Sequence, residues 1–167
     1  MASVHQIPRD QWPSHPNYPA QVLLLGSHEN FRRVSEHLVE RAQTKADLGY
    51  VERLYGRWIS AMRSHEGYEE HKLYPYLAKR WGADFGHATK GHEALHTCDR
   101  DVRSAFRGRE NVQGALRAHD RVLSQHLEHE ETLVIPLLLG LSRGEFEDYA
   151  RSSISDLLQR TRQRSPA

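Results

Sequence analysis

Residues 65–75 read HEGYEEHKLYP, and residues 126–136 read HLEHEETLVIP. In both stretches a glutamate follows the histidine by four residues, and a proline follows it by ten. Because each residue of an α-helix turns by ~100°, residues four apart share one face of a helix. The repeat therefore predicts two helices that each present a histidine and a carboxylate to one side, as in a bundle built from two helical hairpins.

Long proline-free stretches surround both copies, and their apolar residues recur every three or four positions, the period of an amphipathic helix. This spacing predicts four long helices, over residues 21–43, 47–79, 84–107 and 112–141. A capping-box pattern at residues 142–145 (SRGE) predicts a shorter fifth helix that extends to about Arg160. Short connections between long helices favour antiparallel neighbours. The predicted fold is all-α, an antiparallel four-helix bundle with a short C-terminal helix.

The two ends of the chain differ from this helical region. Residues 1–19 contain four of the seven prolines, which disfavour a helix and favour extended segments. We expect a proline-rich N-terminal arm over residues 1–19 that lies against the domain. The bundle domain itself is expected over residues 20–162, followed by a tail over residues 163–167.

Composition excludes several classes of function. Lys and Arg number 23 against 22 Asp and Glu, so the net charge of +1 argues against a nucleic-acid partner. No run approaches the ~18 apolar residues of a membrane span, and the start lacks the apolar core of a secretory signal. The single cysteine, Cys98, excludes an internal disulfide framework and a cysteine-built zinc site. We expect a cytoplasmic protein without a membrane partner, and the composition leaves the oligomeric state open.

The 12 histidines are the unusual feature of the composition. Each predicted long helix carries one group of metal-ligand residue types, which in chain order are His28, His65 with Glu69, His92 with His96, and His126 with Glu130. Neutral imidazole binds first-row metals well, and a carboxylate can bridge two ions. Burying two carboxylates without a cation would cost several kcal/mol each. The sequence therefore predicts a metal site for two ions in the bundle core.

This series of groups, one on each predicted helix, resembles the hemerythrin-like family, also called the HHE cation-binding domain. The resemblance extends from about residue 21 to residue 141 and implies a bundle of hemerythrin type with two iron ions. It implies that one iron is held by His28 and His65, and the other by His92, His96 and His126. Glu69 and Glu130 would bridge the irons together with an oxo or hydroxo group. The iron with fewer histidines would keep a position for dioxygen, hydrogen peroxide or nitric oxide.

One residue departs from the oxygen-carrying hemerythrins, whose fourth helix supplies an aspartate five residues after the histidine. Here Glu130 follows His126 by four residues, as in a broader bacterial branch that includes peroxide-consuming proteins and iron–sulfur repair proteins. The cysteine-bearing N-terminal segment of the repair proteins is missing. The resemblance thus implies a centre that consumes peroxide or oxidises a substrate. The alternatives are a carrier or sensor of dioxygen or nitric oxide without turnover, and a protein that stores or donates iron.

Several neighbouring residues allow two interpretations. His119 precedes His126 by seven residues and either lines an access path or packs at the end of the bundle; packing is favoured. Asp99 either accepts a ring proton from a ligand histidine or pairs with Arg103. His129 is expected at the surface or behind a ligand. Either a tyrosine or a water molecule would occupy the open iron position.

Overall fold

The computed structural model describes residues 7–18 and 22–152, and every regular element within these residues is a helix. The α-helices are α1 (Val22–Arg41), α2 (Leu48–Tyr68), α3 (Tyr74–Trp81), α4 (Gly86–Gly108), α5 (Val112–Leu139) and α6 (Arg143–Arg151). Two 3₁₀ helices, η1 (Arg9–Ser14) and η3 (Lys45–Asp47), and one π-helical segment, η4 (Glu69–Leu73), complete the described chain. The predicted all-α fold class is confirmed.

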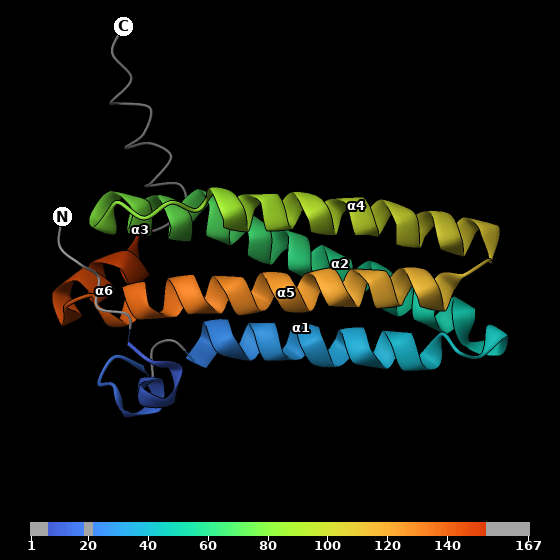
Figure 1. The fold of residues 1–167 in the computed structure, drawn as a ribbon, viewed down its shortest axis with the longest axis horizontal. Coiled ribbons are helices and arrows are strands. Elements are labelled where there is room, and N and C mark those ends of the chain that lie inside the picture. Colours follow the sequence, from blue (N-terminus) through green and yellow to red (C-terminus); the bar gives the residue numbers. More distant parts are fainter. Residues whose placement is uncertain (1–6, 19–21, 153–167) are drawn as a thin grey trace, which may run out of the picture.

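The four long helices α1, α2, α4 and α5 lie along the long axis of the molecule (Figure 1). The colour sequence in Figure 1 shows that the chain reverses direction at each connection between them. Helix α5 packs against both α4 and α1, and α1 also packs against α2. The observed bounds of α1, α4 and α5 lie within about two residues of the predicted ranges.

The predicted helix over residues 47–79 is three consecutive elements, α2, η4 and α3. The π-helical turn of η4 accommodates one more residue per turn than an α-helix, which changes the face that the following residues present. Glu69 and Tyr74 are five positions apart, a spacing that a regular α-helix would set about 140° apart. Both residues are nevertheless buried. The π-helical turn therefore directs two polar side chains from one helix into the same interior.

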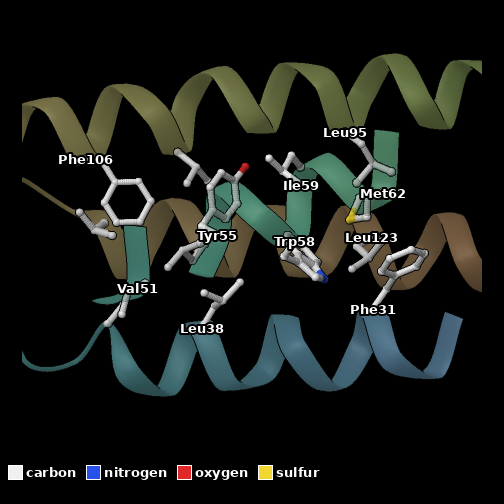
Figure 2. Packing of buried hydrophobic residues seen from close by; sticks show 14 of the residues in the cluster. Phe31, Leu38, Val51, Tyr55, Trp58, Ile59, Met62, Leu95, Phe106 and Leu123 are labelled. Carbon is white, nitrogen blue, oxygen red and sulfur yellow. The ribbon is translucent and has the colours of Figure 1, made fainter. Parts of the chain in front are cut away.

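Two large apolar clusters occupy the interior of the bundle, one toward each end, and a third group of buried apolar residues, Trp12 with Ile135 and Leu139, joins the N-terminal segment to α5. The larger cluster packs side chains from all four long helices, among them Phe31, Trp58, Met62, Leu95 and Leu123 (Figure 2). The smaller cluster lies at the end where α3 and α6 pack, and its members include Leu73, Leu77, Ala88, Val134 and Tyr149. His28, His65, Glu69, His92 and Glu130 lie in sequence between residues that belong to or pack against these two clusters, whereas His96 and His126 are next to Leu95 and Leu127 of the larger one.

The ends of the described chain agree in part with the sequence. Ser142 caps α6 in a capping box with Glu145, as predicted. The helix ends at Arg151, short of the expected end near Arg160, because Ser152 has an extended backbone; residues 153–160 lie outside the described residues. The expectation of extended structure near the N-terminus does not hold at Arg9–Ser14, which forms η1 with Pro13 inside it. Proline fits there because its fixed φ of about −65° lies within the range of a 3₁₀ helix.

None of the helices in residues 22–152 combines the length and the apolar character that crossing a bilayer requires.

Candidate metal centre

A layer of buried polar side chains separates the two apolar clusters. His28, Glu69, His92, His126 and Glu130 are all at most 8% exposed, and they come from α1, η4, α4 and α5. Buried carboxylates and imidazoles are rare unless they are paired or bind a metal. Apolar packing therefore does not account for the burial of these five side chains.

The first group of donor atoms lies between α1 and the α2–η4 junction. His28 Nε2 lies 2.9 Å from His65 Nε2, and the two rings meet edge to face with centroids 5.0 Å apart. Glu69 Oε1 lies 2.7 Å from His65 Nε2 and 3.6 Å from His28 Nε2. Donor atoms of these three residues lie within 4.8 Å of one another, a set that could hold one metal ion.

The second group lies between η4, α4 and α5. Glu69 Oε2 lies 3.2 Å from His92 Nε2, and the rings of His92 and His126 meet edge to face at 4.7 Å. Glu69, His92 and His126 form a second set that could hold a metal ion. Gly91 makes this arrangement possible, because a Cβ atom at that position would lie 2.3 Å from His126 Nδ1. The absence of a side chain at residue 91 thus leaves room for the imidazole of His126.

Both glutamates lie between the two histidine pairs. Glu69 directs one oxygen toward each pair, and Glu130 Oε2 lies 3.6 Å from both His28 Nε2 and His126 Nε2. The other oxygen of Glu130 accepts a hydrogen bond from the buried hydroxyl of Tyr74 at 2.6 Å. This hydrogen bond holds the carboxylate in the orientation that presents Oε2 to the histidines.

The polar atoms that face this layer fit a pair of cations. Within the described chain, Glu69 Oε1 and Oε2, His92 Nε2 and Glu130 Oε2 are buried without a hydrogen-bond partner. A buried polar group without a partner costs about 1–3 kcal/mol, and more when it is charged. Imidazole and carboxylate are both ligands that first-row metals accept. Cations bound among these four atoms would supply the partners that the atoms lack.

The histidines of the layer differ in protonation when no cation is bound. Burial lowers the pKa of His126 to about 3, with a further contribution from the charge of His92. Burial also disfavours the charged forms of His28 and His92, but hydrogen bonds to neighbouring glutamates outweigh it and raise the pKa of each to about 9. A cation bound to these rings must therefore displace protons from two of them.

The two central carboxyl groups titrate in opposite directions. Burial and the nearby charge of Glu69 raise the pKa of Glu130 to about 8. Glu69 is also buried, but the nearby imidazoles of His28, His65 and His92 hold its pKa well below its usual range. Two negatively charged carboxylates this close repel each other strongly in a medium of low dielectric constant, so one of them tends to stay protonated. A cation bound between them would allow both to be ionised.

The structure brings together six of the seven predicted site residues: His28, His65, Glu69, His92, His126 and Glu130. It does not bring His96 into either group. The His96 side chain is 39% exposed, and its Nε2 lies 2.7 Å from Glu66 Oε2 on α2. Glu66 is buried, and burial raises its pKa to about 7. His96 and Glu66 form a polar pair beside the buried layer.

Three residues at the centre escaped sequence reasoning: Tyr74, Glu70 and Glu131. Glu131 Oε1 lies 3.1 Å from His28 Nδ1, and Glu70 Oε1 lies 2.7 Å from His92 Nδ1. Both glutamates follow a central glutamate directly, so their position five residues after the histidine in each copy of the repeat was a usable signal. Tyr74 carries no such signal, because it is buried through the π-helical turn before it.

The residues with two interpretations are placed as follows. Asp99 accepts hydrogen bonds from Arg103 and from the hydroxyl of Tyr55, which agrees with the pairing interpretation. His119 is buried against the rings of Tyr55 and Trp58, and burial lowers its pKa to about 4. His129 lies on α5 with its ring 4.0 Å from that of His87. All three lie outside the two donor groups.

Histidines and glutamates from facing helices thus define a helical-bundle protein with a candidate cation site in its core. The profile of the hemerythrin HHE cation-binding domain matches residues 21–138, and the chain belongs to this family. The matched range extends from α1 to the end of α5 and contains every residue of both donor groups. Comparison with curated proteins found no match, and comparison with solved structures found none either.

Proposed function

We propose that this chain is a non-haem diiron protein whose centre consumes hydrogen peroxide. The observation that carries the proposal is the placement of Glu69, whose two oxygens lie 2.7 Å from His65 Nε2 and 3.2 Å from His92 Nε2. One carboxylate thereby joins two histidine pairs, as a ligand shared by two ions requires. Iron, rather than another first-row metal, follows from membership of the family and from the histidine-rich donors.

The residues of the chain have separate roles in this proposal. His28 and His65 would hold one ion, His92 and His126 would hold the other, and Glu69 and Glu130 would be shared between the two. Such an iron pair supplies the capacity to accept and return two electrons. Two molecules of hydrogen peroxide then yield two molecules of water and one of dioxygen. The surrounding apolar clusters exclude bulk water from the buried donors.

Peroxide consumption, rather than reversible binding of dioxygen, is supported by the carboxylate of α5. Glu130 follows His126 by four residues, where the oxygen carriers of the family have an aspartate after five. Elemental analysis of iron-loaded protein should give about two irons per chain and little zinc, and an oxygen electrode should record dioxygen release on addition of peroxide. A long-lived oxygen adduct of the diferrous protein that dissociates at low oxygen pressure would instead identify a carrier or sensor.

Two variants in α4 test the ligand set, because the sequence predicts His96 as a metal ligand and the structure places it outside both donor groups. His92→Ala should lose about one iron per chain, because His92 lies within the second donor group. His96→Ala should retain both irons, because the His96 ring pairs with Glu66. Iron content measured on the two purified variants decides the matter. Equal loss of iron from both would establish the seven-ligand set that the family resemblance implies.

A further inference from the structure

The second glutamate of each repeated motif lies behind a histidine of the other helical hairpin. Glu131 on α5 contacts Nδ1 of His28 on α1, and Glu70 in η4 contacts Nδ1 of His92 on α4. In each pair the Nδ1–H group donates to the carboxylate, which leaves Nε2 of the ring directed at the centre. Carboxylates in this position orient a ligand histidine and raise its basicity. Glu131 and Glu70 are therefore positioning residues for the two donor groups.

The surroundings of the two positioning glutamates are unequal. The side chain of Glu131 is 1% exposed, whereas that of Glu70 is 37% exposed. Arg32 Nη1 lies 2.8 Å from one oxygen of Glu131, and Arg9 Nη2 lies 2.6 Å from the other. Among the residues that the structure describes, no guanidinium group pairs with Glu70. The carboxylate behind His28 is thus held on both oxygens, while the one behind His92 is held by His92 alone.

The N-terminal segment, residues 7–18, supplies one of these two guanidinium groups. Trp12 anchors the segment, because its buried ring packs in a cluster with Ile135 and Leu139 of α5. The guanidinium carbon of Arg9 lies 5.3 Å from the centre of the Trp12 ring, and Arg9 Nη1 also binds Glu128. The contact with the ring of the anchored Trp12 holds Arg9 in the orientation that reaches the buried carboxylate of Glu131.

We propose that the N-terminal segment stabilises one of the two metal positions. Arg9 holds Glu131 in place, and Glu131 in turn holds the ring of His28. The ion held by His28 and His65 therefore dissociates more slowly than the ion held by His92 and His126. The inference rests on the proposed two-metal centre. Loss of a carboxylate behind a ligand histidine weakens metal binding by about 10–100-fold, which sets the size of the expected effect.

The test measures metal release from the full-length chain loaded with two Co²⁺ ions, whose absorbance reports their coordination. With excess chelator, the unaltered protein should release cobalt in two phases of different rate. Glu131→Gln should accelerate the slow phase about 10–100-fold and leave the fast phase unchanged. Arg9→Gln should accelerate the same phase to a smaller extent, because Arg32 still holds Glu131. Glu70→Gln should accelerate the fast phase.

Two controls separate positioning from general loosening of the bundle. Glu128→Gln removes the exposed partner of Arg9 but leaves its contact with Glu131, so both phases should keep their rates. The double variant Arg9→Gln/Glu131→Gln should release cobalt no faster than Glu131→Gln alone. Three outcomes would overturn this inference and leave the two-metal proposal standing. They are an unchanged slow phase in Arg9→Gln, equal acceleration of both phases in Glu131→Gln, and a single phase of release from the unaltered protein. Fewer than two bound cobalt ions in the unaltered protein would overturn the two-metal proposal and this inference with it.

Discussion

At the scale of single residues, adjacent glutamates perform different tasks. The glutamate four residues after the histidine, Glu69 or Glu130, faces the buried layer, and the next one, Glu70 or Glu131, contacts a histidine of another helix. A helix turns by ~100° per residue, so consecutive side chains cannot face the same point. The helix thus directs one carboxylate inward and the next toward a neighbouring helix.

Glu130→Ala tests the assignment of the bridging carboxylates. The variant should lose iron and the reaction with peroxide, because both histidine pairs lose a shared ligand. The metal-free variant should have a free energy of unfolding close to that of the unaltered metal-free protein, because removal of a buried carboxyl group is offset by loss of the partner of the buried Tyr74 hydroxyl. Iron content, oxygen release and urea denaturation measure the three effects.

His129→Ala is the matched control, one position earlier on α5. Its ring lies against His87, outside both donor groups, so iron content should stay near that of the unaltered protein. Full iron content and peroxide reactivity in Glu130→Ala would show that a different carboxylate bridges the ions.

At the scale of elements, the irregular segments place residues that regular helices would not. The π-helical turn of η4 brings Tyr74 to Glu130, and η1 brings Arg9 to Glu131. Helix α6 covers the end of the smaller apolar cluster with Tyr149 and depends on its cap for its start. The side chain of Ser142 accepts a hydrogen bond from Glu145 N, and Ser142 N donates to Glu145 Oε2.

Ser142→Ala should lower the free energy of unfolding by about 1 kcal/mol, because the first turn of α6 loses a partner for a backbone N–H group. Urea denaturation of the metal-loaded protein measures the change. Ser104→Ala, at an exposed position in the C-terminal part of α4, is the control and should leave the stability unchanged or slightly higher, because alanine has a higher helix propensity than serine. Equal stability of both variants would mean that α6 does not contribute to the cooperative unit.

At the scale of the whole molecule, the polar layer connects two apolar clusters that pack at opposite ends of the bundle. Its ligands come from all four long helices or the π-helical segment that extends one of them. Ions bound there would tie together elements that are distant in sequence, and they would stabilise the folded state because the unfolded chain holds no assembled site.

Removal of the metal should lower the melting temperature of the whole bundle. At a free metal concentration 1,000 times the dissociation constant, binding contributes about 4 kcal/mol of stability. Differential scanning calorimetry of the iron-loaded and chelator-treated forms measures the difference. In Glu130→Ala the chelator should have a much smaller effect. Equal melting temperatures of the two forms of the unaltered protein would place the metal at the periphery.

Metal uptake should release protons, and the apparent affinity should rise as the pH increases from about 6 to about 9. The metal-free centre holds protons on His28 and His92, with pKa values of about 9, and on Glu130, with a pKa of about 8. A ligand must be deprotonated to bind, so fewer protons compete as the pH rises through these values. Titration calorimetry in two buffers of different ionisation enthalpy counts the protons released. No proton release at pH 7 would contradict the predicted protonation of the metal-free centre.

The sequence by itself determined the helices and most of the centre. Amphipathic spacing located α1, α4 and α5 to within about two residues, and one group of histidines and glutamates on each predicted helix identified the six residues that the structure brings together. Both signals are local, because residues three or four apart share a helix face whatever else the chain does.

Tertiary structure decided what local periodicity does not encode. His96 lies four residues after His92 on α4, yet Glu66 of α2 pairs with it beside the layer. Tyr74 reaches the centre through a change of helical geometry, and Arg9 reaches Glu131 from 122 residues away in the chain. These contacts depend on which helices pack together and on how far each side chain lies from the surface. Partners that are distant in sequence come together only when packing of the apolar clusters has placed their helices.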